Sequence, residues 1–130
     1  MAHIVLILIL LVSGLRSMVQ PVTLENESPQ RQHLERESLC EPVFEYFPAC
    51  IDFLTSTKCE KPSFQCCVNV AELNLLAKEG IGPRWICWCI EYMVEGLKPP
   101  LNATRISELP IKCHTHLSFP ISEGMDCDKV

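Results

Sequence analysis

The sequence predicts a small all-α domain of four helices that disulfide bridges hold together. Two observations support this prediction. Nine cysteines occur in 130 residues, a density typical of small exported domains that are stapled by bridges. Between the cysteines, apolar residues recur at spacings of three and four, which is the period of one face of a helix.

The N-terminus indicates the compartment in which these cysteines would oxidise. Residues 4–12 form an unbroken apolar run, and small or polar residues follow as far as Ser17. This is the pattern of a secretory signal peptide, which we assign to residues 1–19. The run is too short to span a bilayer. The sequence therefore predicts a secreted, extracellular protein.

Residues 20–39 are polar and charged, with few large apolar side chains. Such a segment buries too little surface to offset the entropy lost on ordering. It is expected to form a flexible N-terminal extension, with a solvated helix over residues 31–38 as the alternative. Residues 40–130 remain, which is enough for one domain.

The first two helices are expected on either side of the loop that holds Cys59. The first covers residues 42–56, and its apolar side chains are spaced four, four and three: Val43, Phe47, Ile51 and Leu54. The second follows Ser63 and ends at Gly80 and Gly82. Its apolar face carries Val70, Leu73, Leu76 and Ala77.

The third and fourth helices are predicted from their ends. Pro83 suits the first turn of a helix that runs to Gly96. Asn102 or Thr104 is expected to cap a short fourth helix that Pro110 stops. Beyond it the chain reads as irregular, with one apolar cluster formed by Phe119, Pro120 and Ile121.

Eight of the cysteines stand in a distinctive order, with one adjacent pair and one pair separated by a single residue: Cys40, Cys50, Cys66, Cys67, Cys87, Cys89, Cys113 and Cys127. Eight cysteines permit 105 pairings, so the order alone leaves the bridges open. On a helix, Cys87 and Cys89 lie about 200° apart, and whichever faces Cys40 selects its partner. Cys59 falls outside this order, and an odd cysteine is either a free thiol or half of an intermolecular bridge.

With its CC and CXC pairs, this order resembles the eight-cysteine motif of plant non-specific lipid-transfer proteins. Intervening stretches also resemble that family: Leu73-Asn74, Leu101-Asn102-Ala103, Leu109-Pro110-Ile111-Lys112-Cys113, Ile121-Ser122 and Asp126-Cys127. Gaps of nine, nineteen, twenty-three and thirteen residues are similar to type 1, the longer subfamily, whereas the apolar Trp88 between two cysteines is more like type 2. We give the spacing more weight because it involves more constraints.

Resemblance to type 1 implies a specific set of bridges, and type 2 would exchange the partners of Cys40 and Cys127. The type 1 bridges are Cys40 with Cys89, Cys50 with Cys66, Cys67 with Cys113, and Cys87 with Cys127. The resemblance also implies a right-handed four-helix bundle with an internal apolar tunnel and an irregular C-terminal loop. The candidates for lining this tunnel are Val70, Leu73, Ala77, Ile90, Ile106, Leu109, Ile111, Phe119 and Ile121. A place in an ordinary hydrophobic core would explain each of these residues about equally well.

Two family features for the polar end of a lipid are altered. The family's Asp-Arg pair before the fifth cysteine is replaced by Gly82-Pro83, which leaves Arg84 one position later. Arg84 is the candidate for binding a phosphate or carboxylate, with a solvated residue at the helix start as the alternative. The family's loop aromatic, usually Tyr, is Phe119 here, so a hydroxyl donor is missing.

The resemblance implies a secreted, monomeric carrier of fatty acids, lysolipids or phospholipids that contacts membranes transiently. The alternative is a protease or amylase inhibitor, or a storage protein, from the wider eight-cysteine group. Storage proteins favour glutamine-rich stretches, and Gln65 alone falls within residues 40–130.

Charge and motifs exclude several other functions. Residues 40–130 hold twelve acidic side chains against eight of Lys and Arg, a net charge of minus four, which opposes attraction to nucleic acid or anionic membranes. No G-x-S-x-G, H-E-x-x-H or phosphate-loop motif occurs, so no enzyme and no cofactor are expected. The cysteines lack zinc-ligand spacing, and His114 and His116 are expected at the surface, so no metal is expected either.

Overall fold

The computed structural model describes residues 28–58 and 61–130, and over these ranges it is all-helical. Cys59 and the predicted signal peptide lie outside the described residues. The elements are α2 (Pro29–Tyr46), α3 (Pro48–Thr55), α4 (Phe64–Glu79), α5 (Pro83–Val94), α6 (Ala103–Lys112) and the 3-10 turn η1 (Cys127–Lys129). The predicted all-α class with four disulfides is confirmed. None of the described helices is both long and apolar enough to cross a membrane.

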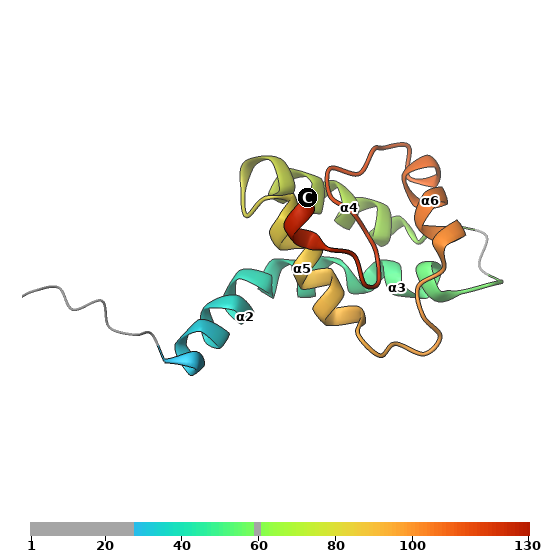
Figure 1. Cartoon of the computed structure of the whole chain (residues 1–130). Coiled ribbons are helices and arrows are strands. Elements are labelled where there is room, and N and C mark those ends of the chain that lie inside the picture. The colour runs from blue at the N-terminus through green and yellow to red at the C-terminus, as the bar shows by residue number, and fades with distance from the viewer. Residues whose placement is uncertain (1–27, 59–60) are drawn as a thin grey trace, which may run out of the picture.

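The N-terminal part of α2 projects away from the rest of the molecule (Figure 1). It starts at Pro29 and its first eleven residues are exposed, so the helical alternative for residues 31–38 matches the structure. The first core residue on α2 is Cys40. Residues 20–27 lie outside the described part of the chain.

The single helix predicted over residues 42–56 is two helices, which meet at Phe47. Pro48 starts α3 and has no N–H, so it cannot donate to the carbonyl of Phe44, and the hydrogen-bond ladder is interrupted there. Close to this break, the side-chain amide of Asn69 on α4 donates to the carbonyl of Tyr46 at 2.8 Å. The apolar face survives this break, because Val43, Phe47 and Leu54 are all buried.

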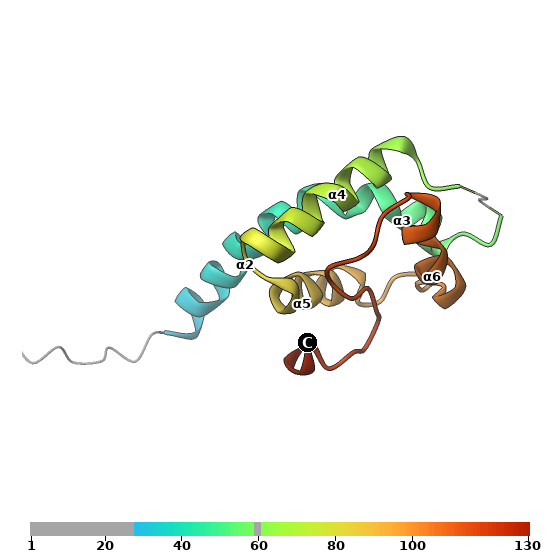
Figure 2. The same ribbon diagram turned by 90° about the horizontal axis from the view of Figure 1, so that it is seen from above.

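The ends of α4 and α5 agree with the sequence prediction. The hydroxyl of Ser63 accepts from the backbone N–H of Cys66 at 3.0 Å and caps α4. Pro83 starts α5 after Gly82, whose φ of 86° is accessible to glycine at little cost. α4 lies alongside the α2 and α3 pair, and α5 packs against both α2 and α4, as seen from above in Figure 2.

α6 begins where expected, because the Asn102 side chain accepts from the N–H groups of Thr104 and Arg105. The prediction that Pro110 stops it is wrong, since the helix continues to Lys112. Pro110 removes one hydrogen bond but the backbone dihedral it imposes is helical. The helix ends at Lys112. Just beyond it, His114 has a φ of 53°, and the N–H of Thr115 donates to the carbonyl of Pro110 at 2.9 Å.

Candidate functional site

The interior between the helices and the C-terminal loop is apolar. Seven of the ten candidate lipid-binding residues lie in this buried core: Val70, Leu73, Ala77, Ile90, Leu109, Phe119 and Ile121. Three of them form a stripe on α4 at spacings of three and four, so they point to one side of the helix. They share the interior with the aromatic side chains of Phe47 and Phe53. In the described structure these side chains pack against one another.

The two remaining apolar candidates are on α6. Ile106 is partly buried and packs against the core. Ile111 is 73% exposed, so the structure places it outside the interior. Leu109 faces inward, and a residue two positions later lies about 200° around the helix, which turns Ile111 to the solvent. We therefore leave Ile111 out of the interior wall.

Arg84, the candidate for a lipid's polar end, lies on the first turn of α5 and faces away from the interior. One guanidinium nitrogen, Nη2, is 2.6 Å from Oδ1 of Asp128, beside the C-terminal turn η1. Both side chains are more than half exposed, so the pair contributes little to stability. Arg84 does line a cavity, but that cavity is on the outer surface between α2 and α5.

Asn74 holds the C-terminal loop over the interior. This buried side chain on α4 donates to the carbonyl of His116 at 2.8 Å and accepts from the N–H of Ser118 at 2.8 Å. These bonds bring Phe119 and Ile121 down onto the core, where both are buried. The sequence offered one signal for this contact. Asn74 is a polar residue beside the apolar stripe of α4, and a buried amide side chain needs hydrogen-bond partners.

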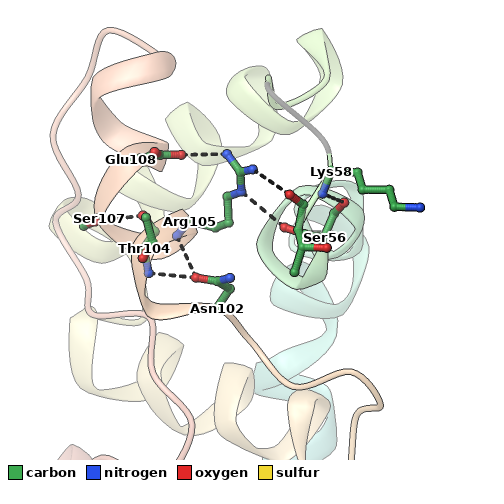
Figure 3. Close-up of polar contacts among 8 residues, drawn as sticks. Ser56, Lys58, Asn102, Thr104, Arg105, Ser107 and Glu108 are labelled. Atoms are coloured by element: carbon green, nitrogen blue, oxygen red, sulfur yellow. Dashed lines mark hydrogen bonds and ion pairs between the residues drawn. The ribbon is translucent and has the colours of Figure 1, made fainter.

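Arg105 on α6 joins this helix to the chain that follows α3, a contact that the sequence analysis did not predict (Figure 3). Its Nε donates to the carbonyl of Ser56 at 3.2 Å, just beyond the end of α3. Its Nη1 pairs with Oε2 of Glu108 at 2.8 Å. The guanidinium also lies 5.4 Å from the ring centroid of Phe53, within cation–π range. Residues about fifty positions apart meet here, so no local pattern could have shown it.

Four bridges join these elements in the type 1 pairing: Cys40 with Cys89, Cys50 with Cys66, Cys67 with Cys113, and Cys87 with Cys127. Cys89 faces α2 and Cys87 faces the C-terminal turn, so neighbouring positions on α5 hold two different parts of the chain. Cys87 and Cys127 lie near Glu91 in an arrangement that could resemble a metal site. Their sulfurs are bonded to each other, so they have no thiolates to offer a metal.

An open cavity of about 590 Å³ lies on the outer side of α2 and α5. It is lined by His33, Arg36, Glu37, Cys40, Phe44, Arg84, Trp85, Trp88, Tyr92 and Asp128. A second, shallower cavity of about 640 Å³ shares Phe44 and Tyr92 with it. Apart from Arg84, none of the ten candidate lipid-binding residues lines either of these two cavities.

The order of cysteines, their pairing and the helical architecture can now be compared with known proteins. The sequence model described as "Protease inhibitor/seed storage/LTP family" matches residues 40–127. Non-specific lipid-transfer protein 13 of Arabidopsis thaliana is 47% identical over 92 residues, which cover 70% of this chain and 72% of that protein. The chain belongs to the plant non-specific lipid-transfer protein family.

Other known proteins align over a similar length. Protein ARABIDOPSIS THALIANA ANTHER 7 is 35% identical over 101 residues, covering 69% of this chain and 71% of that protein. Non-specific lipid-transfer protein 3 of Oryza sativa subsp. indica is 30% identical over 91 residues, covering 70% and 74%. The solved structure of the allergen Art v 3 superposes with a TM-score of 0.58 at 27% identity, covering 70% of this chain and 96% of that one.

Proposed function

We propose that this protein is a secreted, monomeric, non-enzymatic carrier that binds fatty acids, lysolipids or phospholipids in its apolar interior. Transient membrane contacts would let it transfer these lipids between membranes or to extracellular surfaces. The observation that carries the proposal is the continuous apolar interior, which α4, α5, α6 and the C-terminal loop all line. Relatives at 47% and 30% identity are named lipid-transfer proteins, which supports the same function.

An apolar wall is sufficient chemistry for such a ligand. Each CH₂ group of an acyl chain gains about 0.8 kcal/mol on burial and requires no directional partner. Side chains such as Leu73, Ile90 and Leu109 offer only hydrocarbon surface. The proposal therefore predicts broad specificity, with affinity that increases with chain length.

Lipid entry requires these packed side chains to move apart while the domain stays folded. The bridges help, because each one limits the separation of two elements even when the core between them loosens. The bridge from Cys67 to Cys113 ties α4 to the end of α6, and Cys40 with Cys89 ties α2 to α5. We infer that the helices shift around an incoming chain within these limits.

The test is displacement of a fluorescent fatty acid from the oxidised protein by unlabelled acids of increasing length. Saturable binding that strengthens with chain length is expected. The variant Phe119→Glu should bind at least about tenfold more weakly, because it adds a charge without a partner to the apolar interior.

Ile111→Glu is the matched control, since it adds the same charge at a position that is exposed and outside the interior. It should bind like the wild type, and far-UV circular dichroism should show that both variants are folded. A folded wild-type protein without saturable binding at any chain length would contradict the proposed function. Equal effects of the two variants would contradict the assignment of the interior as the site.

A further inference from the structure

Four aromatic side chains line the cavity on the outer side of α2 and α5, and one of them, Phe44, also packs against the core on its inner side. Trp85, Trp88 and Tyr92 are spaced three and four on α5, so they form one stripe, opposite the stripe that buries Ile86 and Ile90. Trp88 is 47% exposed and Tyr92 is 59% exposed. Large aromatic side chains at the surface are a feature of binding sites rather than of inert surface.

α2 completes this surface. Phe44 stacks on Tyr92, with 6.1 Å between ring centroids. The cavity on the outer side of α2 and α5, which these four aromatic residues line, is called the aromatic groove. The second cavity continues it past Phe44 and Tyr92 to Ile51 and Met93 on α3 and α5. The apolar surface is therefore longer than a single small-molecule pocket.

The groove carries both signs of charge at its edges. Arg36 lies on α2 and Arg84 on α5. The acidic lining residues are Glu37, whose Oε1 is 3.6 Å from Nδ1 of His33, and Asp128, which pairs with Arg84. Arg84 with Asp128 is an exposed ion pair, which can open to a ligand at little cost. A ligand with only negative charge would meet these carboxylates and the net charge of minus four on residues 40–130. A zwitterionic ligand meets a partner for each of its charges.

We propose that the aromatic groove binds phosphocholine head groups and docks the protein on zwitterionic lipid surfaces. Quaternary ammonium groups bind to the faces of clustered aromatic rings by cation–π attraction, and here Glu37 and Asp128 add negative charge beside the rings. The guanidinium groups of Arg36 and Arg84 suit the phosphate. Trp and Tyr also favour the interface between water and lipid tails.

This inference rests on the proposed function, because a lipid carrier has to reach a membrane to load and unload. It assigns docking to a surface that is separate from the interior where the acyl chain binds. The two sites make different demands, since the groove reads the head group and the interior takes the chain. They can therefore be lost independently.

The experiment uses the fact that the chain has two tryptophans and both line the groove. Tryptophan emission of the oxidised protein is recorded with vesicles of phosphatidylcholine, with and without brominated acyl chains, and with vesicles of phosphatidylglycerol. Phosphatidylcholine should shift the emission to the blue, and brominated chains should quench it. Phosphatidylglycerol should do so more weakly, and free phosphocholine should compete with docking on phosphatidylcholine.

Two variants locate the contact. Tyr92→Ala keeps both tryptophans and should weaken vesicle binding roughly fivefold, as expected for the loss of one cation–π and interface side chain. Phe64→Ala is the matched control, because Phe64 is 84% exposed but lies at the start of α4 and outside the groove. Tyr92→Ala should also slow lipid transfer between vesicles while leaving fatty-acid affinity unchanged.

Several results would overturn the inference. They are the absence of quenching by brominated phosphatidylcholine, equal or stronger docking on phosphatidylglycerol, and equal effects of the two variants. Tryptophan emission that is shielded from iodide in the absence of lipid would mean that residues 20–27 cover the groove. An emission shift that depends on protein concentration would mean that a second copy covers it. If fatty acids bind but vesicles do not, the docking site is wrong and the carrier function stands. If the protein binds vesicles but not fatty acids, the docking site stands and the carrier function is wrong.

Discussion

Arg105 is the contact between the end of α3 and α6, and its removal tests whether this contact stabilises the closed interior. The Arg105 side chain is 16% exposed. The substitution Arg105→Ala removes all of its contacts at once. The backbone N–H of Asn102, which donates to the carbonyl of Leu54 at 2.8 Å, remains in the variant. α6 should therefore stay in place but be held less firmly.

The magnitude follows from the separate contacts. A hydrogen bond from a charged donor to the carbonyl of Ser56 contributes about 1.5–3 kcal/mol. The 3.5 Å contact to the carbonyl of Thr57 is at the limit of hydrogen bonding and is not counted. The cation–π contact with Phe53 adds about 0.5–1 kcal/mol, and the helical ion pair with Glu108 adds about 0.2–0.5 kcal/mol. Since such contributions are not fully additive, we expect Arg105→Ala to lose about 2–3 kcal/mol of unfolding free energy.

Urea unfolding with the bridges intact, followed by far-UV circular dichroism, measures this loss. The midpoint should fall by about 1 M or more at an unchanged slope. Glu108→Gln is the control, because it removes the ion pair and leaves the carbonyl bond, and it should cost no more than about 0.5 kcal/mol. An unfolding free energy of Arg105→Ala within about 0.5 kcal/mol of the wild type would refute the stabilising role of Arg105, and so would a loss in Glu108→Gln as large as that in Arg105→Ala.

Two further predictions concern the C-terminal loop and the cysteines. Asn74→Ala should cost about 1–3 kcal/mol, because it leaves the N–H of Ser118 without a partner and leaves the carbonyl of His116 with only the 3.3 Å bond from the Thr115 hydroxyl. Amide exchange should speed up at residues 118–121, while Leu75→Ala, on the exposed side of the same turn, should leave it unchanged; loop exchange equal in both variants would count against this role. Cys59→Ser should be nearly neutral, whereas replacing Cys67 and Cys113 together opens a bridge spanning 46 residues and should cost about 4 kcal/mol. Peptide mapping without reduction checks this, and finding Cys59 bridged to a framework cysteine would refute it.

Local signals in the sequence were sufficient for much of the fold. The caps at Ser63 and Asn102, Pro83 at the start of α5 and the apolar stripe of α4 are all encoded within a few residues of where they act. The effect of a proline on a helix could not be predicted from the sequence in the same way. Pro48 divides a predicted helix, yet Pro110 leaves another unbroken, because the cost of one lost hydrogen bond depends on how the surrounding helix is packed.

The all-α class, the positions of most helices and most apolar residues of the interior could be predicted from the sequence, because periodicity and cysteine order are properties of the chain. Which side chains from distant segments meet depends on the packing of the folded chain. This packing turned Ile111 outward, paired Arg84 with Asp128, brought Arg105 to the end of α3 and gathered Phe44 with the aromatic stripe of α5. Such contacts depend on the angle and rotation at which helices pack, and neither is encoded in the residues of one helix.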